Sequence, residues 1–454
     1  MINIRQLFLV TVLPFLSGCG GLINSKYSAP PMILPEHWQS VTINEAAGYP
    51  YAWQEFNDPL LISLQKQTLL RNADVELAAT RVKQAALSLE QTSVQFEPAV
   101  SGNIGASSGR PLDYHNKWNR SVSASLGIDS EIDLWGIQTR QRDAAALSVK
   151  SAEQSLRQTY LLLMESVSDN YWLLGVLNER LTFSLQDEET ARATLQLVML
   201  RWQAGKVSAV DVVNARQNMI SQETNTRQLK RQLIEARNTQ SLLAGMPVGK
   251  ILAEPSALHR GKLPQVRAGL PVNILARRPD VSQAELALRQ ALTNVDISHA
   301  ELYPGFSLST SLGTSSTELM SFISNPVASL SAAFSLPFLN WRAHELSIKQ
   351  AQLSYQQEVI HFRQTLYAAM VEVDNTLTLQ AQLREEQSQL EELLQLAYRS
   401  ETLSRIRYQA GAAPLNFWLD AQQQRRQAEY RVTENRFSLY QALARLSVVS
   451  GGAQ

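Results

Sequence analysis

The sequence predicts a mixed α and β membrane protein made of two similar halves, each with two strands and very long helices. A motif at 201–205 (Arg-Trp-Gln-Ala-Gly) returns at 407–411 (Arg-Tyr-Gln-Ala-Gly), a shift of 206 residues. Further landmarks obey the same shift: Asp74 and Asp280, Pro98 and Pro304, Trp135 and Trp341. A constant shift leaves no room for a net insertion, so the two halves should be structurally equivalent around a pseudo-symmetry axis.

The N-terminal residues have the pattern of a lipoprotein signal peptide, which we place at 1–18. Arg5 precedes a short apolar stretch at 7–15, too short to span a bilayer, and Leu-Ser-Gly-Cys at 16–19 resembles a lipobox. Cys19 is the only cysteine in the sequence, so we expect it to carry lipid and no disulfide to form. The alternative is an ordinary secretory signal beside an incidental cysteine. A single lipid-bearing residue anchors a protein to a membrane only in part, so we expect a second part of the chain to bind the membrane as well.

The charge and hydropathy of the sequence argue against a nucleic-acid-binding protein and against a transmembrane helix in the mature chain. The formal net charge is zero, with 41 basic and 41 acidic residues, which argues against nucleic acid as a partner. After the signal there is no apolar run of about 20 residues. If the mature chain crosses a membrane, it must therefore do so as β-strands.

We divide the mature chain into four parts. A proline-containing stretch at 19–58 is an extended, lipid-anchored leader, because prolines there block helix formation. The first structural repeat follows at 59–250, a connector at 251–278, and the second repeat at 279–451.

Strands are predicted where the hydrophobic period becomes two. From Val122 to Leu134, even positions are apolar except at Ser130, and odd positions are polar; weaker or similar alternation occurs at 100–109, 306–313 and 328–338. The even-numbered face should meet lipid, and the odd face, with Asp129, Glu131 and Asp133, should face a wet lumen. The alternative is the edge of a soluble β-sandwich with solvated carboxylates.

Each second strand should lead into a very long helix. Residues 137–204 contain no proline and only Gly175, and 342–410 contain neither proline nor glycine. A continuous helix of about 68 residues would be roughly 100 Å long. Each helix should end at a glycine turn, Gly205 or Gly411, and a shorter helix should return.

Four strands per chain cannot close on themselves. A closed barrel needs about eight or more strands, and an open sheet in lipid leaves costly unpaired backbone groups. The sequence therefore requires several copies to assemble.

The order of elements, the duplication and the lipobox resemble the TolC-like outer-membrane efflux family, in its lipoprotein branch. Specific segments carry the likeness: Ser130–Gly136, Arg277–Val281, Leu302–Pro304 and Leu419–Gln422. The resemblance implies a homotrimer with a 12-stranded β-barrel, four strands per chain, continued by an α-helical coiled-coil tunnel in the periplasm. It further implies a passive exit duct for drugs or other small molecules, anchored in outer-membrane lipid and docked to a periplasmic adaptor and an inner-membrane transporter.

The resemblance also places a gate near the two glycine turns, which would dock the adaptor. Asp211 and Tyr408 match groups that tether inner to outer helices, and Asp420 matches an acidic position of the constriction. Phe417 replaces an acidic residue of some members, so the gate is either an acidic ring or a hydrophobic one around Phe417 and Trp418. Alternatively, the two aromatic residues simply pack between helices.

No residue pattern indicates catalysis or a cofactor. Gly105–Gly109 matches G-x-S-x-G, but Arg110 and Pro111 follow and no helix begins there. The six histidines show no paired spacing for a metal. Two alternatives to the efflux duct stay open: a type I secretion exit duct and a non-conducting, lipid-anchored periplasmic spacer. The transporter could be a proton-driven RND pump or a MacB-type ABC exporter.

If Asp211 and Tyr408 tether the helices at the gate, removing both groups should loosen the closed tip. We predict that Asp211→Ala with Tyr408→Phe raises single-channel conductance in planar bilayers. Unchanged conductance would count against the tether.

Overall fold

The computed structural model describes residues 25–31, 53–110, 118–250, 252–261, 263–264, 274–316 and 326–452. Cys19, the predicted lipid attachment site, lies outside these ranges. Among the described residues, no helix has the length and apolar character needed to cross a membrane.

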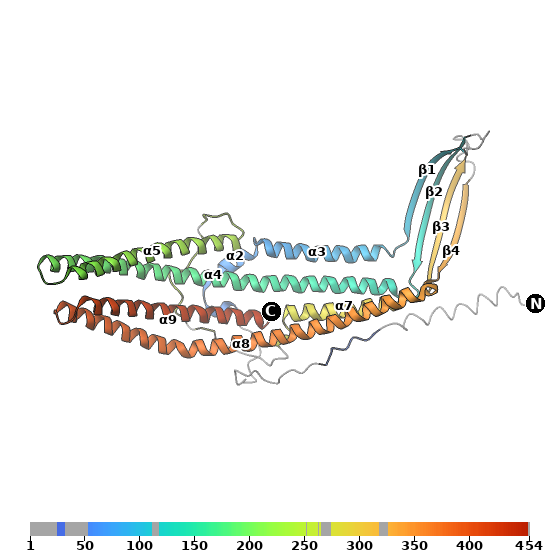
Figure 1. Cartoon of the computed structure of the whole chain (residues 1–454). Helices are drawn as coiled ribbons and strands as arrows, with labels where there is room; N and C mark the ends of the chain where they lie inside the picture. The colour runs from blue at the N-terminus through green and yellow to red at the C-terminus, as the bar shows by residue number, and fades with distance from the viewer. Residues whose placement is uncertain are drawn as a thin grey trace, which may run out of the picture. The chain divides into compact units, whose positions relative to one another are not determined.

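The described elements follow the predicted order twice (Figure 1). The first repeat contains α2 (Pro59–Leu69), α3 (Ala73–Val94), β1 (Ala99–Gly109), β2 (Asn119–Ile132), α4 (Ile137–Gln203) and α5 (Ala209–Leu243), after the 3-10 helix η1 (Trp53–Phe56). The second contains α7 (Pro279–Ala300), β3 (Gly305–Ser316), β4 (Pro326–Ser335), the 3-10 helix η3 (Pro337–Asn340), α8 (Trp341–Gln409) and α9 (Leu415–Val449). Both bounds of α3 and α5 recur 206 residues later in α7 and α9, so the internal repeat is confirmed.

The chain divides into two compact units. Of the described residues, the sheet unit comprises 25–31, 79–110, 118–154, 282–316 and 326–364, and the helical unit comprises 53–78, 155–250, 252–261, 263–264, 274–281 and 365–452. The helices α4 and α8 have 67 and 69 residues, which agrees with the length predicted from the absence of proline. In the helical unit, α4 turns back into α5 and α8 turns back into α9 (Figure 1).

The sheet unit contains one antiparallel sheet in the order β1-β2-β3-β4. Its register always places even-numbered residues opposite even-numbered residues, as in Leu126 opposite Leu312 and Phe306 opposite Phe334. The apolar positions of neighbouring strands therefore share one face, as the period of two predicted. Ile104 on this face is 88% exposed in the single chain.

The core of the helical unit is an aromatic cluster. Trp172 lies between Phe56 and Tyr440, with ring centroids 5.0 and 4.9 Å away. Beside it, the buried Tyr171 hydroxyl donates to the carboxylate of Asp58, which also accepts from backbone amides at the start of α2. The helices therefore pack around a local core that includes η1 and α2.

Four helices of the helical unit end in the same glycine motif. At the end of α4, the Gly205 amide donates to Trp202 and the next amide donates to Arg201, with Gly205 at φ +70°. The same pair of bonds ends α5 at Gly245, α8 at Gly411 and α9 at Gly451. This is the Schellman motif, in which a left-handed residue satisfies the last helix carbonyls, and it explains the recurring glycines.

Substitution of two of these glycines separates the effect of the positive φ from the effect of close packing. Alanine at Gly205 meets only the unfavourable positive φ, because no other atom lies within 4 Å of the added Cβ, and should cost about 1–2 kcal/mol. Alanine at Gly245 would also bring Cβ within 2.3 Å of the Arg71 carbonyl oxygen, which adds about 1–3 kcal/mol. Thermal unfolding should show the larger loss for Gly245→Ala. Equal losses would contradict this packing.

Candidate functional site

The tip of the helical unit is held by an arginine that joins the two repeats. Arg201, at the end of α4, donates to the carbonyls of Tyr408 and Gln409 at 3.2 and 3.1 Å. Its guanidinium carbon also lies 4.8 Å from the centroid of the Tyr408 ring, a cation–π distance. The buried Tyr408 ring packs against Trp418, 5.5 Å between centroids. The first glycine turn is thereby bonded to the second.

Asp211 has a local role in this structure. It forms a capping box at the start of α5: its carboxylate accepts from the Ser208 amide at 3.0 Å, and its own amide donates to the Ser208 hydroxyl. Tyr408 Oη is buried without a hydrogen-bond partner among the described residues, and burial raises its pKa. No direct Asp211–Tyr408 hydrogen bond is therefore present, and their joint tethering stays a prediction.

The two adjacent aromatic residues of α9 have different environments. Trp418 is 5% exposed and packs with Val198, Ala215 and Leu415, as expected for a residue between helices. Phe417 is 58% exposed in the single chain, and Asp420 is exposed as well. The packing alternative thus describes Trp418, whereas Phe417 and Asp420 are free to contribute to a pore.

A half-buried ion-pair network, which the sequence did not predict, lies further along α9. Arg425 bonds Glu401 of α8 at 2.6 Å, Glu429 one turn along α9 at 2.7 Å, and Asp187 of α4. Burial lowers the pKa of Arg425, but the three carboxylates outweigh this and raise it. For Asp187, burial dominates and raises the pKa despite the pairing. Arg425 therefore links the α8–α9 hairpin to α4 as a fixed cation.

This network has no counterpart in the other repeat. A shift of 206 residues takes Arg425 to Met219, Asp187 to Leu393 and Glu401 to Leu195. Sequence reasoning had no signal for it, because Arg425 and Asp187 are 238 positions apart and neither belongs to a repeated motif. The network distinguishes the two repeats chemically.

A second network connects the base of the same helices. Arg445 of α9 bonds Glu165 at 3.0 Å and also Glu372 of α8. Arg278 bonds Glu372 and Asp280, each at 2.7 Å. Asp169, one turn from Glu165, has a buried carboxylate oxygen without a hydrogen-bond partner among the described residues. Burial and, second, the charge of Glu165 raise the pKa of Asp169 to about 7.

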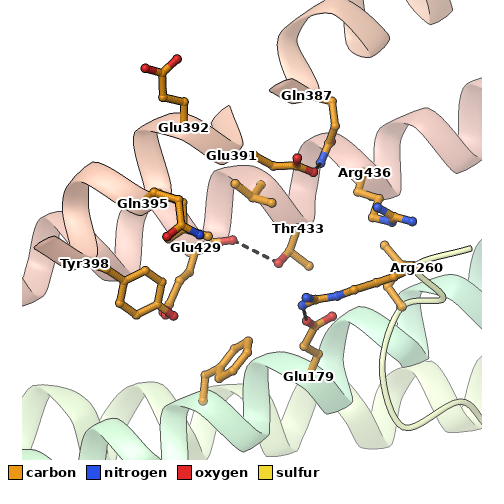
Figure 2. Close-up of a pocket in the computed structure, with 14 residues that line it drawn as sticks. Glu179, Arg260, Gln387, Glu391, Glu392, Gln395, Tyr398, Glu429, Thr433 and Arg436 are labelled. Atoms are coloured by element: carbon orange, nitrogen blue, oxygen red, sulfur yellow. Dashed lines mark hydrogen bonds and ion pairs between the residues drawn. The ribbon is translucent and has the colours of Figure 1, made fainter. Parts of the chain in front are cut away.

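An open cavity of about 560 Å³ lies between α8, α9 and the connector (Figure 2). Glu179 and Arg260 form an ion pair of 2.5 Å at one side, and Glu391, Glu429 and Arg436 lie across the cavity. Among the described residues, no cluster of three histidine, cysteine or acidic side chains has metal-binding geometry. The described wall of the cavity mixes charged side chains with apolar ones such as Phe183 and Leu394, and it presents no set of ligands directed at one point.

The predicted lumen carboxylates of β2 divide into two kinds. Asp129 lies opposite Ser309 and Glu131 opposite Ser307, both on the odd-numbered face of the sheet. Asp133 lies beyond the end of β2, where its carboxylate accepts from the Gln138 and Thr139 amides and the Thr139 hydroxyl. It therefore caps the start of α4 in addition to any exposure to the lumen.

The described leader segment 25–31 binds α7. The Ser25 amide and hydroxyl donate to the two carboxylate oxygens of Asp296, at 3.0 and 2.6 Å. Arg289 lies 4.5 Å from the centroid of the Tyr27 ring. Asp296 is buried, and it holds the segment that follows Cys19.

A four-stranded antiparallel sheet that continues into helices of nearly 70 residues is the fold found in outer-membrane channels. The family model described as "Outer membrane efflux protein" matches residues 64–245 and 270–452. The chain therefore belongs to this family of outer-membrane efflux channels, and the fold class and efflux function predicted from the sequence are confirmed.

The chain is similar to named relatives and to solved structures over nearly its whole length. The pyoverdine export outer membrane protein OpmQ of Pseudomonas aeruginosa is 28% identical, covering 99% of this chain and 97% of the relative. The cation efflux system protein CusC of Escherichia coli is 28% identical, covering 95% and 98%. The solved outer-membrane channel OprN has a TM-score of 0.83 at 21% identity, covering 94% and 99%, which shows the shared fold.

The raised pKa of Asp169 predicts a pH-dependent cost. The folded state holds the proton up to about pH 7 whereas the unfolded state releases it near pH 4, so this group lowers stability progressively as pH rises through that window. Asp169→Asn should therefore raise the melting temperature at pH 8, on the order of 2 °C, and change it little at pH 4. Asp143→Asn, at an exposed aspartate of the same helix, is the control. A gain of equal size at both pH values would refute this.

Proposed function

We propose that three copies of this chain form one closed duct through the outer membrane, extended into the periplasm by the helical hairpins. The sheet supports this most directly, because it has an apolar face and two outer edges without a strand partner among the described residues. Unpaired strand edges are costly in lipid and are removed only when the sheet closes. One chain supplies four strands, so closure requires other copies.

The leader after Cys19 would supply the membrane anchor, and the two glycine turns would supply the contact with partner proteins. Lipid on Cys19 would hold the leader at the membrane, and the Ser25–Asp296 bonds would fix the leader to α7. The turns at Gly205 and Gly411 would dock a periplasmic adaptor, which would connect the duct to an RND or MacB-type inner-membrane transporter. The lumen would be lined by Asp129, Glu131 and Asp133.

The closed state would be held by Arg201 and Arg425. Each joins the second repeat to α4, and Arg425 does so through the half-buried carboxylate of Asp187. Asp211, Tyr408, Phe417 and Asp420 would form the surrounding gate, with Phe417 and Asp420 exposed to line it. Opening would then require the α8–α9 hairpin to leave Arg201 and the Asp187 carboxylate.

The cargo would be selected by the transporter. Relatives with similar coverage are named for pyoverdine export, cation efflux and toluene efflux, so the duct itself accommodates different small molecules. Export of drugs or other small molecules is the function that we favour. The "toxin and drug export protein A" of Aggregatibacter actinomycetemcomitans, 24% identical, keeps a type I secretion duct as the second candidate.

Planar-bilayer recording tests both the proposed duct and the proposed role of Arg425 in holding it closed. The detergent-purified protein should run as a heat-labile trimer and form pores. Arg425→Gln leaves three half-buried carboxylates without their cation, should weaken this contact by about 1.5–3 kcal/mol, and should raise conductance. Arg431→Gln, at an exposed arginine of the same helix, should leave it unchanged. If the protein forms trimers but neither it nor the Arg425→Gln variant conducts, it would instead be a spacer.

A further inference from the structure

The apolar, even-numbered face of the sheet carries positive charge at one rim. Among the residues of the four described strands, Arg120 is the only charged residue at an even-numbered position, and Arg110 directly follows β1 in the same alternation. Both side chains are exposed in the single chain, as is Trp118 just before β2. Building on the proposed duct, in which this face meets lipid, we propose that Arg110 and Arg120 bind the phosphate groups of a lipid headgroup in the outer leaflet.

The strand register brings the two arginines close together. Arg120 lies opposite Ser108, and Arg110 is two residues beyond Ser108, so the arginines are diagonal neighbours across the β1–β2 pair. Diagonal neighbours have Cβ atoms about 7–8 Å apart, which long side chains can bridge. Both guanidinium groups can therefore contact one phosphate group or two phosphate groups of the same headgroup. Arginine suits this task because its planar set of N–H donors matches the oxygens of a phosphate.

The length of β2 places the arginines at the level of the headgroups. From Val122 to Ile132 the even-numbered positions are apolar except at Ser130. These residues extend over about 34 Å along the strand. At a strand tilt of about 35–45° they would cross about 24–28 Å of bilayer, which matches the apolar band of about 25 Å in membrane barrels. Arg120 is the next even-numbered residue beyond this band, at the level where tryptophan residues such as Trp118 are also preferred.

The arginines lie at the end of the sheet that is farther from the helices. The strand β1 begins at Ala99, shortly after α3, and β2 ends at Ile132, shortly before α4. The last residue pair of these two strands, Gly109 with Asn119, is therefore at the opposite end of the sheet (Figure 1). When the helices extend into the periplasm, that end of the sheet faces the outer leaflet.

The acidic residues of the sheet are too distant to neutralise this rim. In the described strands the acidic residues are Asp129 and Glu131, and both lie on the odd-numbered face. Asp129 is about 30 Å from Arg120 along β2. The rim is thus cationic and continuous with an apolar face, which complements a lipid that has an anionic headgroup and acyl chains. The repeat equivalents of the two arginines are Ser316 and Pro326, so the second repeat has no matching basic pair.

A lipid titration of the detergent-purified trimer, read by native mass spectrometry, tests the site. The probe is lipid A, a glycolipid with two phosphate groups. We expect the unmodified protein to bind lipid A, and Arg110→Gln with Arg120→Gln to weaken binding by about fivefold for each arginine replaced. Arg110→Lys with Arg120→Lys keeps both charges and should restore most of the binding. Arg81→Gln, at an exposed arginine of α3, is the matched control and should bind lipid A as the unmodified protein does.

Three results would overturn the lipid site and leave the duct intact. The first is a glutamine pair that forms conducting, heat-labile trimers and binds lipid A as tightly as the unmodified protein. The second is equal binding of lipid A from which both phosphate groups have been removed. The third is displacement of lipid A by excess inorganic phosphate, which would indicate a site for free phosphate.

Two further outcomes separate this site from the assembly. If the glutamine pair fails to form trimers, the single substitutions Arg110→Gln and Arg120→Gln decide, and each should weaken lipid A binding by about fivefold. Unchanged binding in both single variants would overturn the lipid site. An unmodified protein that is a monomer without pores would overturn the duct and the lipid site together.

Discussion

The structure depends on one constraint, which is that backbone amides and carbonyls at a strand edge need partners. Within a single chain the sheet leaves the outer edges of β1 and β4 without strand partners among the described residues. In water this arrangement invites aggregation, and in lipid each unpaired group costs several kcal/mol. Ile104 and Phe334 on the apolar face are exposed in the single chain, which is unfavourable in water because of the hydrophobic effect. The isolated chain is therefore an incomplete object, and its repeats make sense as parts of a ring.

The features that the sequence predicted are those with a period. The alternation of β2, the long helices and the recurring glycines all came from local rules, and the structure places them where those rules require. The strand register is equally periodic, because the apolar face admits only even-numbered shifts. What could not be predicted depends on residues distant in sequence. Arg425 and Asp187 meet only because α9 packs beside α4, and no motif marks either residue.

The repeat conserves positions of contact while changing their chemistry. The Asn72 side-chain amide donates to the Leu243 carbonyl, and 206 residues later the Arg278 guanidinium donates to the Val449 carbonyl. The Asn72 side chain otherwise accepts only from backbone amides at the start of α3, whereas Arg278 connects through Glu372 to Arg445 and Glu165. The equivalent carbonyls at the ends of α5 and α9 thus accept a hydrogen bond from a neutral amide in one repeat and from a charged network in the other. Duplication supplies the frame, and substitutions within the frame make the halves unequal.

The two tips show the consequence of this inequality. Ser208 precedes α5 and forms a capping box with Asp211, whereas Pro414 precedes α9 and provides no side-chain cap. A capped first turn is stabilised by about 1 kcal/mol through its own helix alone. The second hairpin lacks that local support and relies on contacts with the first, through Arg201 and Arg425. A hairpin that is held mainly by contacts with another hairpin can be released when a different surface competes for those contacts. A hairpin whose first turn is stabilised by its own cap does not depend on such contacts. The α8–α9 hairpin is therefore the element of this chain best suited to move.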